Sequence, residues 1–265
     1  MKKIDTTTIG HSVHGKAIYA YHVGDYGENQ IIVTGAIHAR EWITALLILE
    51  LVEIYRKEKF NGGVYFVPLC NPDGVEIALT REPLWKANAR GVDLNVNFDA
   101  DWGGGVQNVR EPGSENYIGP HPASEPEVQA LIDFTRAVKP KATIAYHSKG
   151  EEIYYNGLRD CERTKQLAYA VAESTGYKPI KPRGSTGGYS DWVSLHLGVP
   201  ALTIEVGNDN YAHPIGVDKL DEILAQNKDV IRVLFSTLFD EPERNATGNS
   251  QSRDTSDNAD NQAKV

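Results

Sequence analysis

The hydrophobic pattern changes from a continuous run to helical spacing within residues 30–57. Residues 30–37 are apolar and β-branched, which predicts a buried strand, and the apolar spacing over 43–55 predicts a helix. Between them lies the tetrapeptide His-Ala-Arg-Glu, so His38 and Glu41 fall at a strand-to-helix turn. A histidine and a carboxylate three residues apart can bind one divalent metal there, although an ordinary surface turn explains this stretch alone equally well.

Strands and helices alternate along the rest of the chain. Further strands are predicted over residues 16–23, 64–70, 142–146 and 201–206. Further helices are predicted over residues 124–138, 161–175 and 218–239. Ser124 and Glu127 form a capping-box pattern, and residues 71–74 read as a turn. This order of elements predicts an α/β fold, a single domain with a twisted, mostly parallel (mixed) central sheet and helices on both faces.

Two segments do not follow this pattern. Residues 99–124 are glycine-rich and without periodicity, which indicates a functional loop over the site or a mobile surface loop. Residues 241–265 contain no leucine, isoleucine or aromatic residue and predict a disordered polar tail. We therefore expect one catalytic domain over residues 1–240.

Composition narrows the classes of function. A formal net charge of -9 over 265 residues argues against a nucleic-acid or anionic-membrane surface. The two cysteines, Cys70 and Cys161, predict neither a disulfide framework nor a thiolate metal site. No stretch approaches the ~20 apolar residues of a membrane span, and no signal peptide is recognisable, so the expected location is the cytoplasm. The sequence leaves the oligomeric state open.

Polar residues also stand at the ends of two later predicted strands. His147 follows residues 142–146, and Glu205 lies in the apolar run LTIEV. A hydrolytic zinc needs about three protein ligands and an open position, and His38, Glu41 and His147 are of the right types. A buried Glu205 needs a reason to be there. Either it forms an ion pair with a cation, or it acts as a general base on a metal-bound water. The HExxH motif and its inverted form are absent, so any metallopeptidase here uses separated ligands.

These residues resemble the carboxypeptidase A-like zinc peptidase family over about residues 9–239. The similarity is carried by IGHSVHGKAI, HAREW, WKANARGVDLNVNF, SEPE, YHSKG, TGGYSDW and LTIEV. The resemblance implies one Zn²⁺ per chain, held by His38, Glu41 and His147. It also implies Glu205 as the catalytic base and Asp93 as the hydrogen-bond partner of His38.

The chain departs from the family pattern where substrate is held. Carboxypeptidases of this family have an arginine after the asparagine that matches Asn95, whereas this chain has Val96. The arginine that polarises the scissile carbonyl is matched by Lys86, with Arg90 close enough in sequence to replace it. Because lysine and arginine are not interchangeable, the site is expected to bind a different substrate end. The residues implied to bind substrate are Asn95, Arg183, Tyr189 and Ser148. Arg183 stands where carboxypeptidases of the family have a substrate-capping tyrosine.

Within the family, YHSKGEEIYY, WKANARGVDLN and TGGYSDW are most similar to bacterial γ-D-glutamyl-meso-diaminopimelate peptidases. That resemblance implies hydrolysis of the γ-D-glutamyl-diaminopimelate bond, or of another γ-D-glutamyl-diamino acid bond, in a peptidoglycan stem peptide or muropeptide. From the cytoplasm the enzyme would reach the cell wall only if lysis released it. The alternatives are an ordinary metallocarboxypeptidase and a zinc amidohydrolase acting on small N-acyl amino acids. Endopeptidase or carboxypeptidase action, the preferred diamino acid, and a role in recycling, sporulation or phage lysis stay open.

Overall fold

One mixed sheet forms the centre of the molecule. The computed structural model of the protein describes residues 4–155, 162–181 and 184–239. Within these ranges the sheet has eight strands in the order β1-β2-β4-β3-β5-β8-β6-β7. In chain order they are β1 (Asp5–His11), β2 (Ala17–Gly24), β3 (Gln30–Thr34), β4 (Gly63–Val67), β5 (Ala142–His147), β6 (Glu152–Tyr155), β7 (Lys178–Ile180) and β8 (Ala201–Glu205).

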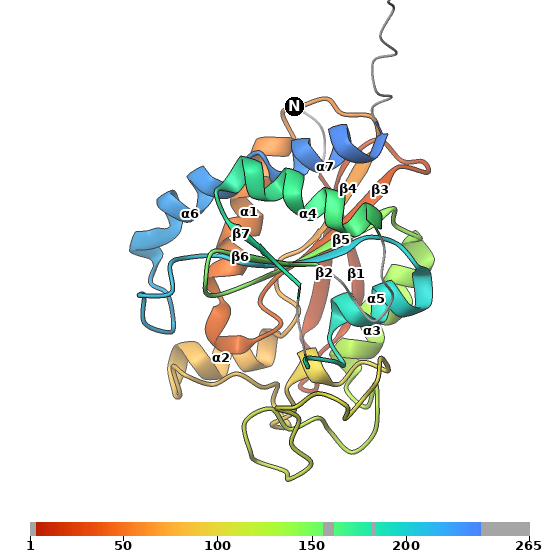
Figure 1. Ribbon diagram of the computed structural model, residues 1–265. Coiled ribbons are helices and arrows are strands. Elements are labelled where there is room, and N and C mark those ends of the chain that lie inside the picture. The colour runs from red at the N-terminus through yellow and green to blue at the C-terminus, as the bar shows by residue number, and fades with distance from the viewer. Residues whose placement is uncertain (1–3, 156–161, 182–183, 240–265) are drawn as a thin grey trace, which may run out of the picture.

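The four central strands β4, β3, β5 and β8 run parallel, so their carboxyl ends meet at one edge. All five residues of β3 and all six of β5 are buried, as expected for strands covered on both faces. Antiparallel pairing appears toward the sides of the sheet, between β1 and β2, between β2 and β4, and between β6 and β8. Figure 1 shows the sheet nearly edge-on between two helical layers.

Helices cover both faces of the sheet, as the order of elements predicted (Figure 1). One apolar core contains residues of α1 (Ile43–Tyr55), α4 (Glu162–Thr175), α6 (Leu220–Asn227) and α7 (Val230–Phe239). The second core contains residues of α3 (Pro126–Val138) and α5 (Tyr189–Leu197). Strand β8 shows the division clearly, because Leu202 and Ile204 enter the first core and Ala201 enters the second. Successive side chains of a strand point to opposite faces, so Thr203 and Glu205 lie on the α5 side with Ala201.

Several sequence-based boundaries were wrong. Residues 71–74 do not form a turn but begin α2 (Pro72–Thr80), with Asn71 accepting the Gly74 N–H at 3.0 Å. Asparagine before proline suits a helix start as well as a turn, because it caps the first turn and proline fits the first helical position. The expected helix over 218–239 divides into α6 and α7.

The expected capping box of α3 is also absent. The helix begins at Pro126, and its cap residue is Glu125, without a side-chain capping bond. The Ser124 hydroxyl instead donates to Glu125, and Glu127 accepts the Val13 N–H at 3.1 Å. Glu127 is thus bonded to a long-range partner and Ser124 to its neighbour, so neither side chain caps the helix.

The strands β1, β6 and β7, toward the two sides of the sheet, were not predicted. They contain many exposed or half-buried positions and lack the apolar signal of the central strands. The glycine-rich segment 99–124 forms no helix or strand and lies below the sheet in Figure 1. Cys70 is a buried free thiol, whereas Cys161 and the predicted tail fall outside the described residues. In the part of the chain that is described, no helix is both long and apolar enough to cross a membrane.

Candidate metal centre and active site

The turn after β3 places His38 and Glu41 together. A short 3-10 helix, η1 (Ala39–Glu41), joins the strand to α1, and His38 is its cap residue. The Thr44 hydroxyl accepts the Ala36 N–H and donates to the Glu41 carbonyl, both at 2.8 Å. Ala36 itself has a φ of 46°, a left-handed conformation that this bond helps to hold. The turn is thereby fixed at both ends of the metal-binding tetrapeptide.

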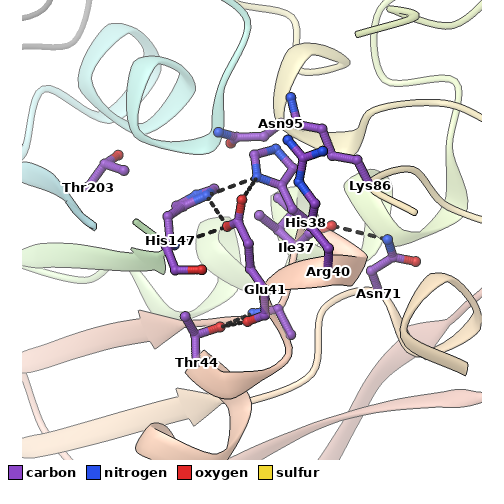
Figure 2. A network of polar contacts seen from close by, with 12 residues as sticks. Ile37, His38, Arg40, Glu41, Thr44, Asn71, Lys86, Asn95, His147 and Thr203 are labelled. Carbon is purple, nitrogen blue, oxygen red and sulfur yellow. Dashed lines mark hydrogen bonds and ion pairs between the residues drawn. The ribbon is translucent and has the colours of Figure 1, made fainter. Parts of the chain in front are cut away.

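His147 reaches the same place from the end of β5 (Figure 2). The Nδ1 atoms of His38 and His147 lie 3.2 Å apart. The two carboxylate oxygens of Glu41 lie 2.9 Å from His38 Nδ1 and 3.0 Å from His147 Nδ1. Backbone register explains the meeting, because β3 and β5 are parallel neighbours whose carboxyl ends share one edge of the sheet.

These three side chains fit a zinc ion. One ligand atom from each can be chosen so that all lie within 4.8 Å of one another, and all three side chains are buried. Two ligands of a tetrahedral zinc at 2.0–2.1 Å lie about 3.3 Å apart, close to the spacing found here. Two imidazoles and one carboxylate form the ligand set of a hydrolytic zinc site that keeps a position open for water or substrate.

Asp93 and Lys86 extend the site behind His38. His38 Nε2 lies 3.2 Å from Asp93 Oδ1, and Lys86 Nζ lies 2.7 Å from Asp93 Oδ2. The Asp93 carboxylate thus accepts the His38 Nε2–H, which leaves Nδ1 as the metal-binding nitrogen. Lys86 Nζ also donates to Asn116 Oδ1 at 2.6 Å, so the ammonium group is held in one position.

Charges within this cluster shift the pKa values. Burial alone would lower the pKa of His38, but Glu41 and Asp93 outweigh it and raise the pKa to about 9 in the protein without metal. Burial alone would raise the pKa of Glu41, yet the two histidines hold it well below its usual range. Burial lowers the pKa of His147. The Glu41 carboxylate is therefore kept ionised, which is the form in which a carboxylate binds a metal.

Glu205 ends β8 directly opposite His147 in the parallel register. Its side chain lines the same cavity as His38 and His147. Burial and the nearby Glu41 carboxylate raise the pKa of Glu205 well above its ordinary value. A carboxylate with a raised pKa beside a metal site is suited to take a proton from water.

A cavity of about 610 Å³ opens over these groups. Of the residues that the sequence assigned to substrate, Lys86 and Asn95 line it. Arg90 lies elsewhere, with its guanidinium 3.5 Å from Glu125. Val96, which stands where the family has an arginine, is part of the cavity wall.

Tyr189 and Ser148, which the sequence also assigned to substrate binding, form hydrogen bonds near the site through their backbone N–H groups. Tyr189 is buried, and its hydroxyl lies 2.9 Å from that of Thr135, while its N–H donates to Asn95 Oδ1 at 3.1 Å. Ser148 is also buried, and its N–H donates to Glu41 Oε2 at 3.2 Å. Neither side chain lines the cavity. Arg183 lies outside the described residues.

The sequence analysis did not single out several residues of the cavity wall, among them Asn116, Tyr154, Lys181, Ser190, Asp191 and Thr203. Thr203 stands two positions before Glu205, and Figure 2 shows it across His147 from His38. Its place could have been inferred, because alternate residues of a strand share a face. Ser190 and Asp191 belong to the motif TGGYSDW, but nothing in that motif indicates which side chains face the cavity.

Comparison with known proteins gives a consistent match. The family model described as zinc carboxypeptidase matches residues 2–229. Gamma-D-glutamyl-L-diamino acid endopeptidase 1 of Lysinibacillus sphaericus is 29% identical over 255 residues, covering 82% of this chain and 63% of that protein. Human carboxypeptidase B is 32% identical over 174 residues, covering 57% of this chain and 42% of that protein. The chain therefore spans less than two thirds of either relative.

Solved structures share the fold. Bovine thrombin-activatable fibrinolysis inhibitor superposes with a TM-score of 0.77 at 23% identity, covering 89% of this chain and 90% of that one. Murein-tripeptide amidase MpaA from Escherichia coli O157 superposes with a TM-score of 0.64 at 20% identity, covering 92% and 95%. At these identities the structures show a common architecture.

Proposed function

The chain belongs to the zinc carboxypeptidase family, and we propose that it hydrolyses the bond between γ-D-glutamate and a diamino acid in peptidoglycan stem peptides. As a member of this family it is a zinc-dependent peptidase that uses one zinc, and His38, Glu41 and His147 fit that ion. The bound zinc would polarise the scissile carbonyl and lower the pKa of a water molecule. Family membership does not identify the substrate, for which we propose the γ-D-glutamyl peptide.

The chain's own residues would move the proton. In this proposal Glu205 accepts a proton from the attacking water and returns it to the leaving amine, because a carboxylate of raised pKa is a stronger base than an ordinary one. Asp93 fixes the ring of His38, and Lys86 neutralises Asp93 while presenting its ammonium group to the cavity. Lys86 is therefore positioned to stabilise negative charge that develops on the carbonyl oxygen.

The main observation in favour of this substrate is the presence of Val96 in the cavity wall. It lines the cavity at the position where carboxypeptidases of the family hold the terminal carboxylate with an arginine, and a valine cannot make that contact. A relative covering 82% of this chain is called a γ-D-glutamyl-L-diamino acid endopeptidase, which supports the same choice. Lys86 and Lys181 both line the cavity, and Lys86 is the one beside the metal ligand His38, where the free α-carboxylate of a γ-linked glutamate would lie, whereas Arg90 contacts Glu125 instead.

A product analysis tests the assignment. The purified, zinc-loaded protein is incubated with L-alanyl-γ-D-glutamyl-meso-diaminopimelate, with its α-linked isomer and with hippuryl-phenylalanine, and mass spectrometry identifies the products. A separate incubation contains a small N-acetyl amino acid. We expect release of diaminopimelate from the γ-linked peptide and little cleavage of the other two. Efficient hydrolysis of the hippuryl substrate alone would show an ordinary carboxypeptidase and overturn the proposal. Cleavage of a small N-acetyl amino acid, with none of the peptides, would indicate the amidohydrolase instead. The Glu205→Gln variant is the control for a contaminating peptidase.

A further inference from the structure

The segment between Lys86 and Asp93 is organised around one buried side chain. Asn88 is fully buried, although the segment forms neither helix nor strand. Its Oδ1 atom accepts the Arg90 N–H at 2.9 Å and the Val92 N–H at 3.1 Å. Its own backbone N–H donates to the Val92 carbonyl at 2.9 Å. A single asparagine thereby closes the segment into a compact turn.

This turn brings the two ends of the segment together beside the metal centre. Lys86 precedes Asn88 by two positions and Asp93 follows it by five, yet Lys86 Nζ lies 2.7 Å from Asp93 Oδ2. The other oxygen, Asp93 Oδ1, lies 3.2 Å from Nε2 of His38, one of the three residues that fit the zinc. Asp93 is therefore the group through which the turn reaches both Lys86 and the metal ligand.

Two buried carboxylates hold the other end of the Asn88 side chain. Asn88 Nδ2 donates to Glu125 Oε2 at 2.7 Å and to Glu127 Oε2 at 3.2 Å. Both glutamates are at most 1% exposed and stand at the start of α3, where the helix dipole favours negative charge. The half-exposed Arg90 guanidinium adds a cation 3.5 Å from Glu125. Without the amide, each carboxylate would lose a donor in a buried place, which is costly.

The hydrogen-bonding capacity of the Asn88 amide is used completely. An asparagine side chain offers two N–H donors and two acceptor positions. Here both donors go to carboxylates and both acceptor positions to backbone N–H groups. An aspartate would lack the donors, and an alanine would lack donors and acceptors alike. The amide therefore ties the turn that ends at Asp93 to the start of α3.

We propose that Asn88 is a positioning residue, which holds Asp93 in the place from which that carboxylate orients His38 and pairs with Lys86. The effect on catalysis rests on the proposed function, in which Lys86 stabilises charge on the carbonyl oxygen. The effect on the metal does not, because Asp93 orients His38 whatever the substrate is. Loss of the Asn88 amide should therefore weaken zinc binding and lower kcat, with a smaller change in KM.

Zinc affinity gives a test that needs no substrate. Competition with a chelator measures the zinc dissociation constant of the wild type, Asn88→Ala and Asn227→Ala. Asn227 is the matched control, because it is also fully buried and donates two side-chain hydrogen bonds, to Tyr177 and Ile223, but lies on α6. Loss of a partner of a metal ligand costs roughly tenfold to a hundredfold, so one step further away we expect about threefold to tenfold weaker binding in Asn88→Ala. Asn227→Ala should bind zinc like the wild type, although urea unfolding should show both variants destabilised.

A double-mutant cycle tests whether Asn88 acts through Asp93. The value of kcat is measured at saturating zinc for Asn88→Ala, Asp93→Asn and the double variant, with the substrate that the product analysis identifies. Removal of the Asn88 amide should lower kcat about tenfold in the wild type but less than about threefold when Asp93 is already changed. A general loss of stability would lower kcat by the same factor in both backgrounds. Equal factors would therefore overturn the inference.

Asn88→Ser keeps the test decisive if the alanine variant does not fold. The serine hydroxyl can still donate to one carboxylate and accept one backbone N–H, so a smaller loss of the same kind is expected. Zinc binding as tight as in the wild type, in whichever of the two variants folds, would overturn the inference. Failure of the proposed function is distinguishable, because the kinetic cycle can then be run with hippuryl-phenylalanine and the zinc titration is independent of any substrate.

Discussion

The Nδ1 atoms of His38 and His147 lie 3.2 Å apart although the two residues are 109 positions apart in the chain. His38 follows the buried strand β3 and His147 ends the buried strand β5, and the two strands are parallel neighbours in the sheet. Glu41 lies within hydrogen-bond distance of both rings. The metal centre is therefore a consequence of strand order, since parallel strands bring their carboxyl ends to one edge.

Removal of one ligand should abolish zinc binding. His147→Ala leaves two protein ligands, which is too few for a stable hydrolytic site. Elemental analysis should find one zinc per chain in the wild type and much less than that in the variant, with activity lost in parallel. His121→Ala, whose ring contacts the Pro122 carbonyl at the surface, is the control and should keep both. Full activity in His147→Ala, or after complete chelation, would show that the site lies elsewhere.

Glu205→Gln should keep zinc but lose turnover. The amide has nearly the same shape and cannot take a proton from water, so kcat should fall by about two to four powers of ten. Glu152 lies opposite Glu205 on the neighbouring strand β6, and Glu152→Gln is the matched control, expected to change kcat only slightly. If Glu152→Gln were the slower variant, the assignment of the base would be wrong.

Thr44→Val should loosen the ligand turn. The buried Thr44 hydroxyl accepts the Ala36 N–H and donates to the Glu41 carbonyl. Valine has the same shape but leaves a buried donor unsatisfied, which costs about 1–3 kcal/mol. Urea unfolding should show that loss, and zinc should bind more weakly. Thr80→Val, which removes an exposed hydroxyl bond to Glu76 O on α2, should change stability by no more than about 0.5 kcal/mol.

Val96→Arg should move the enzyme toward ordinary carboxypeptidase activity. An arginine at this wall of the cavity could bind a terminal carboxylate, a charged contact corresponding to about tenfold to a hundredfold in kcat/KM. We expect faster hydrolysis of hippuryl-phenylalanine and no gain on the stem peptide. Val96→Met supplies the length without the charge and should show no such gain. Equal rates for the arginine and methionine variants would mean that Val96 does not decide the substrate end.

Asp191→Asn should change how stability depends on pH. Burial raises the pKa of Asp191 from its ordinary value near 3.8 to about 6, so ionisation is easier in the unfolded chain. Between about pH 4 and pH 6 the wild type therefore loses stability as pH rises, by about 1–3 kcal/mol for this group. The variant lacks this loss and should gain stability relative to the wild type across that window in urea titrations. Asp133→Asn, an exposed change on α3, is the control for the removal of one negative charge as such.

Local sequence pattern was enough to predict the central strands, the first helix and the candidate metal ligands. Buried central strands such as β3 and β5 are apolar runs because both of their faces are covered, and α1 shows its helical spacing over the residues that it occupies. His38, Glu41 and His147 could be proposed as ligands because each stands next to such a strand. The α/β architecture followed from the order of these elements.

Other features depend on residues far apart in the chain and become visible only in the packed structure. The strands β1, β6 and β7 are half exposed, so pairing with a neighbour rather than hydrophobic pattern defines them. Arg90 was a candidate for the scissile carbonyl, but packing turns it to Glu125, while Lys86 lies against Asp93. Asp191 enters the cavity because α5 packs against β8, a contact that no local signal in TGGYSDW encodes. Spacing along the chain identifies which residues end a strand, but only the packed sheet decides which of them share one cavity.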